Sequence, residues 1–202
     1  MRDLTCGGKN TKIYIKIHKS EVYRQANRFR TNTPTAAAKK RMKDIPEKTN
    51  AVRLLAQKKI KFTTHSYGSA EDDAVSGTEV AKILHQDADD VFKTLVTVGK
   101  TNTHYVFVVP VAKELDLKKA AGAVGEKSID MIKSRELLGL TGYVHGGCSP
   151  VGMKKFFRTV FDISAKTREK IFFSGGRIGL QIETSPTEIE KVIRIEYADI
   201  AK

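Results

Sequence analysis

The sequence VFKTLVTV at residues 91–98 is followed, after the glycine and polar residues 99–103, by HYVFVV at residues 104–109. Both runs are rich in β-branched and aromatic residues, which is typical of β-strands. The short polar segment between them suits a hairpin loop. The sequence therefore predicts two strands that are neighbours in a sheet.

A lysine interrupts the first of these strands. Alternation along the strand would place Phe92, Thr94 and Val96 on one face, and Lys93 and Leu95 on the other. A lysine in such a strand needs an anionic partner or a path to solvent. Taken alone, this pattern is explained better by a solvated strand face than by a functional site.

Caps and turns divide the rest of the chain into further elements. Helices are expected after Thr49 or Asn50, from Ser76 to Leu84, from Asp116 to Gly122 or Gly125, over 134–138 and from Ser185 to Ile193. Strands are expected at residues 62–67, 158–163, 170–173 and 178–184. Helices and strands interleave without a strict βαβ repeat, so we expect an α/β (α+β) fold with a mixed, partly antiparallel twisted sheet and surrounding helices.

Two glycine-rich segments place backbone amides beside polar side chains. Residues 141–152 read TGYVHGGCSPVG, and residues 174–180 read SGGRIGL. Such loops adopt unusual backbone angles and expose amides that can bind an oxyanion or a phosphate. A plain turn explains either loop as well as a binding site does. Neither segment has the order of strand, glycines and helix that a Walker loop or a dinucleotide-binding motif requires.

In order and spacing, residues 91–95, 146–152 and 174–180 resemble the hallmarks of the YbaK-like aminoacyl-tRNA deacylases. The likeness extends over about residues 48–202. This family shares its fold with the editing domain of some bacterial prolyl-tRNA synthetases, and its best known members hydrolyse cysteinyl-tRNA(Pro). The resemblance implies a trans-editing deacylase that needs no cofactor, acts on the aminoacylated 3′ end of tRNA and has prolyl-tRNA synthetase as a partner.

The resemblance also implies site residues. Lys93 would be the catalytic residue, and the substrate-binding residues would be Tyr67, Gly146, Gly147, Ser174, Gly175, Gly176 and Gln181. A lysine at this place can pair with phosphate or polarise the ester carbonyl, while loop amides receive the developing oxyanion. In the family's proposed mechanism the thiol of the substrate itself attacks the ester. Some members have an acidic residue where this chain has Gln181, so the choice of cysteine as the amino acid removed stays an expectation.

Cys148, close to His145, suggests an alternative in which the thiol is the nucleophile. That chemistry requires a lowered thiol pKa and a base within reach. A small apolar side chain that points inward is the better explanation of Cys148. The histidines at positions 65, 85 and 104 lack metal-ligand spacing, and two cysteines are too few for a zinc site, so no metal is expected.

The positive charge of the chain is concentrated at its N-terminus. Residues 1–41 contain eleven Lys or Arg against Asp3 and Glu21, whereas residues 42–202 contain 25 basic and 21 acidic residues. We predict a deacylase domain over 42–202 and a basic extension over 1–41. The extension is interpreted as a solvated tail or as an over-long reading frame with its true start at Met42, in preference to an RNA-contacting arm.

The binding partner and the cellular compartment are inferred from hydropathy and charge, which are weaker signals than the sequence motifs. No apolar run approaches the roughly 18 to 20 residues of a membrane span, so no membrane association and a cytoplasmic location are expected. The basic residues expected to hold tRNA are Lys118, Lys119, Lys154, Lys155 and Arg158, although a solvated surface explains them equally well. The alternative function is a non-catalytic tRNA- or synthetase-binding module with the same pocket.

Overall fold

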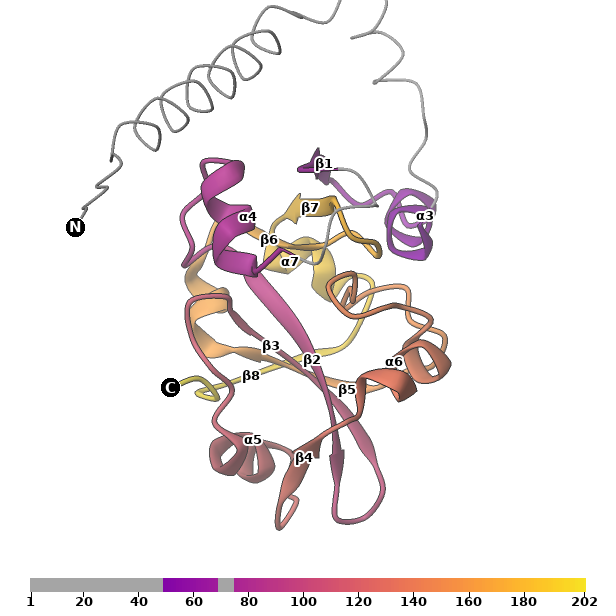
Figure 1. Cartoon of the computed structure of the whole chain (residues 1–202), viewed down its shortest axis with the longest axis vertical. Helices are drawn as coiled ribbons and strands as arrows, with labels where there is room; N and C mark the ends of the chain where they lie inside the picture. The colour runs from indigo at the N-terminus through magenta and orange to yellow at the C-terminus, as the bar shows by residue number, and fades with distance from the viewer. Residues whose placement is uncertain (1–48, 69–74) are drawn as a thin grey trace, which may run out of the picture. The chain divides into compact units, whose positions relative to one another are not determined.

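A computed structural model describes residues 49–68 and 75–202, which belong to one compact unit spanning residues 47–202 (Figure 1). The expectations for the basic extension 1–41 and for its boundary at Met42 lie outside the described residues. Within these residues, no helix is long and apolar enough to cross a membrane.

The predicted hairpin forms the middle of a five-stranded sheet. Strands β2 (Phe92–Gly99) and β3 (His104–Pro110) pair antiparallel, and the strand order is β4-β2-β3-β5-β8. Strand β4 (Ile129–Met131) is antiparallel to β2, whereas β5 (Arg158–Asp162) and β8 (Ile195–Ala198) run parallel to β3 and to each other. The mixed, partly antiparallel sheet is therefore confirmed.

A second sheet has three antiparallel strands in the order β1-β7-β6. These are β1 (Thr63–Ser66), β6 (Ile171–Ser174) and β7 (Leu180–Thr184). The glycine-rich residues 175–179 connect β6 to β7. The two sheets meet where Val91, just before β2, bridges to Phe172 of β6. The start of β2 therefore lies beside the second sheet.

The α-helices of the described residues begin at the caps that the sequence predicts, except the helix Ser134–Thr141, which follows Lys133 without a side-chain cap. They are α3 (Asn50–Gln57), α4 (Gly77–Ile83), α5 (Leu117–Val124), α6 (Ser134–Thr141) and α7 (Pro186–Glu190), with a short 3-10 helix η1 (Ile163–Thr167). Ser76 and Glu79 form a reciprocal capping box at the start of α4. Gly125 ends α5 in the left-handed conformation, which glycine adopts without steric cost.

The five-stranded sheet is buried on both faces by different helices. Along β3, Val106 and Val108 pack into a cluster with residues of α3, α6, α7 and the second sheet, whereas Phe107 and Val109 pack against α5. On β2, Phe92 and Val96 join the first cluster and Leu95 borders the second, as alternation predicts. Burial on both faces explains why β3 reads as a nearly continuous apolar run.

Two strands were not predicted. Strand β4 has three residues, of which only Ile129 is buried, so it carries almost no alternating pattern. Strand β8 has four residues, all half-buried, and includes Glu196. Both are edge strands, and pairing with β2 or β5 stabilises them more than their own composition does.

Candidate functional site

A cavity of about 610 Å³ lies along the open edge of β2. Strand β4 pairs with Thr97–Gly99, which leaves the preceding half of this edge unpaired by a strand. The cavity is lined by the end of β1, the start of α4, strand β2, the segment around residues 131–137, the loop at residues 145–148 and the facing ends of β6 and β7. It therefore joins parts of the chain that are far apart in sequence.

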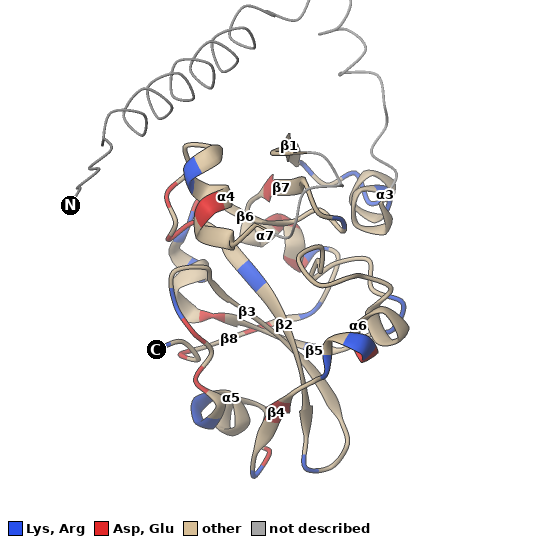
Figure 2. Cartoon of the chain, in the orientation of Figure 1, with Lys and Arg blue, Asp and Glu red and all other residues tan. Residues whose placement is uncertain are grey.

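Lys93 is the basic residue of β2, a strand that is otherwise drawn in tan in Figure 2, where Lys and Arg are blue. Its side chain is half-buried, and its Nζ donates a hydrogen bond of 3.4 Å to the carbonyl oxygen of Val111. Burial lowers the pKa of Lys93, and the charge of Glu114 opposes this shift. Because an ammonium carries three donors, the described contacts leave donors for a ligand in the cavity.

Two buried oxygen atoms on the cavity wall have no hydrogen-bond partner among the described residues. They are Oγ1 of Thr94 and Oε1 of Gln181. Buried polar atoms are nearly always hydrogen-bonded, since an unpaired one costs free energy. The hydroxyl of Thr94 can donate or accept a hydrogen bond, whereas Oε1 of Gln181 can only accept one, so a ligand that donates hydrogen bonds can satisfy both atoms.

Thr94 lines the cavity but is not among the site residues predicted from the sequence. The available signal was a second polar side chain directly after Lys93 in an apolar strand. Thr97 shares the same strand and also has a buried, unpaired hydroxyl, but it does not line the cavity. Only the structure distinguishes these two threonines.

The first glycine-rich loop contributes backbone amides. Gly146 and Cys148 line the cavity, and the N–H groups of both have no hydrogen-bond partner among the described residues. The N–H of Gly147, by contrast, donates to the carbonyl oxygen of Val144 at 3.0 Å. Gly146 has a φ of 78°, a left-handed conformation that favours glycine. The N–H groups of Gly146 and Cys148 belong to residues that line the same cavity as Lys93, and such donors are suited to stabilise a developing oxyanion.

The second glycine-rich loop packs against the first. A Cβ atom at Gly147 would lie 2.9 Å from the Cα of Arg177, and one at Gly176 would lie 2.9 Å from the ring of Tyr143. Gly175 accepts a hydrogen bond of 2.6 Å from Thr49 Oγ1, which ties this loop to the start of α3. These glycines permit close packing of the two loops.

The remaining predicted residues meet at the ends of the second sheet. Ser174 of β6 lies opposite Gln181 of β7 in the strand register. Tyr67 follows β1, and its N–H donates to the carbonyl oxygen of Gly179 at 3.1 Å. All three side chains border the cavity.

The structure thus brings five of the eight predicted site residues to one cavity: Tyr67, Lys93, Gly146, Ser174 and Gln181. Gly147, Gly175 and Gly176 do not line it. Gly147 and Gly176 contact the other loop, and Gly175 contacts Leu180 and Thr49, so any effect on substrate would act through the position of their neighbours. Contact with substrate by any of the eight remains a prediction.

Cys148 has the environment of a packing residue. It is 8 % exposed and belongs to the first core cluster. Burial raises the pKa of its thiol to about 12, which keeps it protonated at neutral pH. No hydrogen bond to His145 is found within the described part of the chain, although both residues border the cavity. This environment supports packing over nucleophilic attack.

Two of the basic residues expected to hold tRNA are engaged in ion pairs within the protein. Lys119 pairs with Asp199 at 2.9 Å, and Arg158 pairs with Glu196 at 2.7 Å. Lys119 lies on α5, whereas Arg158 lies at the start of β5. In the described ranges, no group of three or more His, Cys, Asp or Glu side chains is placed to hold a metal ion.

Residues 71–192 match the family model of the aminoacyl-tRNA editing domain. EbsC of Enterococcus faecalis, named as a candidate Cys-tRNA(Pro)/Cys-tRNA(Cys) deacylase, is 40% identical over 158 residues, which cover 78% of this chain and 96% of EbsC. A proline–tRNA ligase of Shouchella clausii is 34% identical over 85 residues, 42% of this chain and 15% of the ligase.

The fold also has solved counterparts. A crystal structure described as a candidate trans-editing enzyme for prolyl tRNA synthetase has a TM-score of 0.65 and 23% identity, and the match covers 79% of this chain and 99% of that chain. At this identity the likeness shows the fold alone. The fold predicted from the sequence motifs is therefore confirmed.

Proposed function

Because this chain belongs to the aminoacyl-tRNA editing domain family, we propose that it removes the amino acid from mischarged tRNA, with Cys-tRNA(Pro) as its main substrate. The bond cleaved is the ester between the amino acid and the 3′-terminal ribose of the tRNA. The name of EbsC, which matches over nearly its whole length, supports this choice of substrate.

One observation carries the proposal: a half-buried lysine with a single carbonyl partner shares a cavity with two free backbone amides. The cavity of about 610 Å³ is within the roughly 300–1,000 Å³ usual for ligand pockets. It can hold an aminoacyl group together with part of the terminal nucleoside. In this arrangement Lys93 would pair with a phosphate or with the ester carbonyl, and the amides of Gly146 and Cys148 would receive the oxyanion.

The attacking group would come from the substrate. The thiol of Cys148 is kept protonated by its raised pKa, so it is a poor nucleophile. We assign the attack to the sulfur of the cysteinyl group: a carbon–sulfur bond forms, the ester carbon–oxygen bond breaks, and the thiol proton passes to the ribose oxygen. The products are tRNA with a free 3′ hydroxyl and a cysteine thiolactone, which water then opens to cysteine.

The unpaired oxygens of Thr94 and Gln181 would accept hydrogen bonds from the ammonium group of the substrate amino acid. Each buried acceptor would then gain the partner that it lacks among the described residues. Prolyl-tRNA synthetase is the proposed partner. The similarity to part of a proline–tRNA ligase supports a link to the same tRNA.

The test is a deacylation panel with the full chain and cysteinyl-, alanyl-, seryl- and prolyl-tRNA(Pro). We expect many turnovers per protein molecule on Cys-tRNA(Pro). Lys93→Met should reduce kcat/KM by at least about 10²-fold, which is about 3 kcal/mol of transition-state free energy and within the range for one lost electrostatic contact. Retention of tRNA without turnover would identify a binding module instead of an enzyme.

A further inference from the structure

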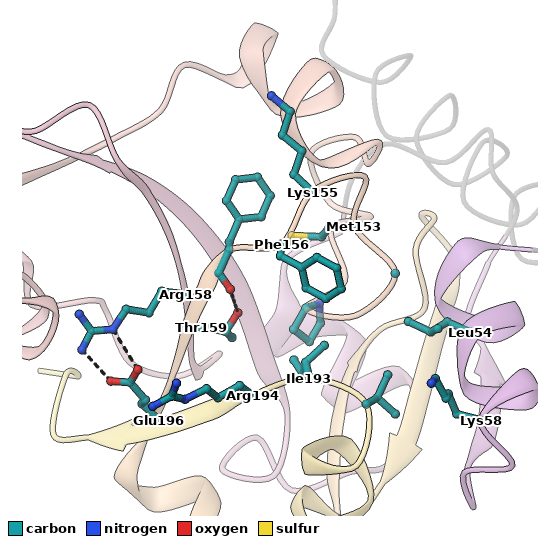
Figure 3. A pocket seen from close by; sticks show the side chains of 14 residues that line it. Leu54, Lys58, Met153, Lys155, Phe156, Arg158, Thr159, Ile193, Arg194 and Glu196 are labelled. Carbon is teal, nitrogen blue, oxygen red and sulfur yellow. Dashed lines mark hydrogen bonds and ion pairs between the residues drawn. The ribbon is translucent and has the colours of Figure 1, made fainter.

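A second hollow, of about 810 Å³, lies apart from the cavity described above (Figure 3). We call it the lateral groove. It is formed by α3, the segment 150–159 and the chain from residue 192 to 196, and it shares no lining residue with the cavity along β2. None of the eight residues predicted for the catalytic and substrate-binding site belongs to it, whereas Lys155 and Arg158, which the sequence suggested as tRNA contacts, do.

The lateral groove has an apolar floor with one unusual side chain at its rim. Leu54, Met153 and Ile193 contribute to the floor. Phe156 is 97 % exposed, whereas the other exposed large hydrophobic residues of the described chain are 40–52 % exposed. A phenylalanine ring presented to solvent in this way offers a free face for stacking. Scattered surface leucines are ordinary, but a fully exposed aromatic ring beside a groove favours a binding surface.

The groove carries a net positive charge. Its lining includes four basic residues, Lys58, Lys155, Arg158 and Arg194, against the single acidic residue Glu196. Glu196 accepts two hydrogen bonds from Arg158, at 2.9 and 2.7 Å, so this pair is internally satisfied. The side chains of Lys58 and Lys155 make no hydrogen bond or ion pair with any residue that the structure describes.

The arrangement surrounds the apolar floor with cations. In Figure 3, Lys58 extends from α3 on one side, and Arg194 and the Arg158–Glu196 pair lie on the other side, along β8. Phe156 lies between them. Cations around an aromatic platform are the combination that binds a nucleic-acid strand, because phosphates pair with the cations while a base stacks on the ring.

We propose that the lateral groove binds the acceptor arm of the tRNA whose 3′ end enters the cavity along β2. The proposal rests on the function proposed above. It identifies an RNA-binding surface that is separate from the chemistry. Phe156 would stack on an exposed base, and Lys58, Lys155 and Arg194 would contact phosphates.

The two hollows are connected through one stretch of chain. His145, Gly146 and Cys148 line the cavity, and Pro150 begins the segment that lines the groove. Cys148 and Pro150 are two residues apart, so their Cα atoms are at most about 7 Å apart. The proposal therefore requires that an RNA strand with its end in the cavity continues past this segment into the groove.

The first measurement is the affinity of the full chain for uncharged tRNA(Pro), which is determined by fluorescence anisotropy. Phe156→Ala should weaken binding about five-fold or more, the usual effect of losing one stacked base. Phe156→Tyr should retain most of the affinity because it keeps the ring. Lys155→Glu should weaken binding and make the slope of log affinity against log salt shallower by about 0.7 to 0.9 per lost phosphate contact.

A matched control is Lys127→Glu, which makes the same charge change at an exposed lysine outside both hollows. It should leave the affinity nearly unchanged. Equal tRNA affinities for wild type, Phe156→Ala and Lys155→Glu would overturn the proposal. An effect of these variants that appears only when prolyl-tRNA synthetase is present would also overturn it, by making the groove a protein-docking surface.

The second measurement compares two substrates, Cys-tRNA(Pro) and the cysteinylated trinucleotide CCA. Phe156→Ala should raise KM for the tRNA about five-fold or more and leave the trinucleotide reaction unchanged. Equal losses on both substrates would show that Phe156 acts on the cavity and would contradict a separate groove. If wild type deacylates neither substrate, the proposed function fails, while the tRNA affinities still decide whether the groove binds RNA.

Discussion

Gly147 lies directly against the backbone of Arg177. A Cβ atom at Gly147 would be 2.9 Å from the Cα and 3.0 Å from the carbonyl carbon of Arg177. The two glycine-rich loops are therefore one packed unit, although about 30 residues separate them in the sequence. This contact fixes the loop that carries Gly146 and Cys148 beside the cavity.

The first prediction concerns this contact. Gly147→Ala should lower the free energy of unfolding by about 1 to 3 kcal/mol, because the added methyl meets backbone that cannot rotate away. Gly122→Ala is the control: no atom lies within 4 Å of its Cβ position, and it lies inside α5. That substitution should stabilise the fold by about 0.5 to 1 kcal/mol. Urea unfolding of both variants checks the pair, and equal effects would disprove the packing argument.

The second prediction concerns the pH dependence that Lys93 confers. Burial lowers its pKa, so its charged form is lost at a lower pH than for an exposed lysine. If the ammonium acts on the substrate, kcat/KM is highest below the folded-state pKa of Lys93 and falls as the pH rises through this pKa. Lys93→Arg should lower activity but remove this alkaline limb, because a guanidinium stays charged. An alkaline limb of the same position in Lys93→Arg would assign the titration to another group.

The free energy of unfolding should respond to pH in the direction opposite to kcat/KM. Because the folded-state pKa of Lys93 is below the unfolded one, charging this lysine is less favourable in the folded protein. The contribution of Lys93 to the free energy of unfolding therefore rises as the pH increases from the folded-state pKa to the unfolded-state pKa. Lys93→Met should accordingly keep or raise the midpoint of urea unfolding at neutral pH while it abolishes activity, and a destabilised variant would contradict the burial argument.

The third prediction separates two threonines of β2. Thr94→Val should lower kcat/KM about ten-fold, as expected for one lost hydrogen bond of about 1.4 kcal/mol. Thr97→Val should leave activity unchanged, because its hydroxyl is equally unpaired but does not border the cavity. Neither variant should lose stability, since no hydrogen bond within the described protein is broken. Equal activities of the two variants would exclude Thr94 from substrate binding.

These threonines show where sequence reasoning ends. The hairpin, the helix caps and the two faces of β2 were predictable, because local periodicity and capping act within a few residues. Contact between the loops at Gly147 and Arg177 depends on tertiary packing, and residue patterns alone left both loops explicable as plain turns. Lys155 and Arg158 of the lateral groove were named from the sequence as tRNA contacts, but the groove itself could not be predicted. It is formed jointly by α3, residues 150–159 and β8, and no single segment carries its pattern.

The fourth prediction concerns Cys148. Cys148→Ala should retain most of the deacylase activity, because its raised pKa leaves little thiolate and its buried position indicates a packing role. Loss of the sulfur leaves a small cavity, so a modest destabilisation of about 1 kcal/mol is expected. Inactivation of the wild type by a thiol reagent with protection by substrate, together with an inactive alanine variant, would restore the nucleophile hypothesis.

The fifth prediction concerns residues 1–41. A chain that begins at Met42 should keep the midpoint of urea unfolding and the deacylase activity, because the buried core of the described residues begins at Ala51. The slope of log tRNA affinity against log salt should also stay unchanged. If the eleven basic residues of this segment contact RNA, the slope would instead become shallower by about 0.7 to 0.9 for each lost phosphate contact. Lys155→Glu in the shortened chain is the internal comparison. Because the groove is still present there, this substitution should make the slope of log affinity against log salt shallower, as it does in the full chain. A shortened chain that fails to fold would show that residues 1–41 complete the core.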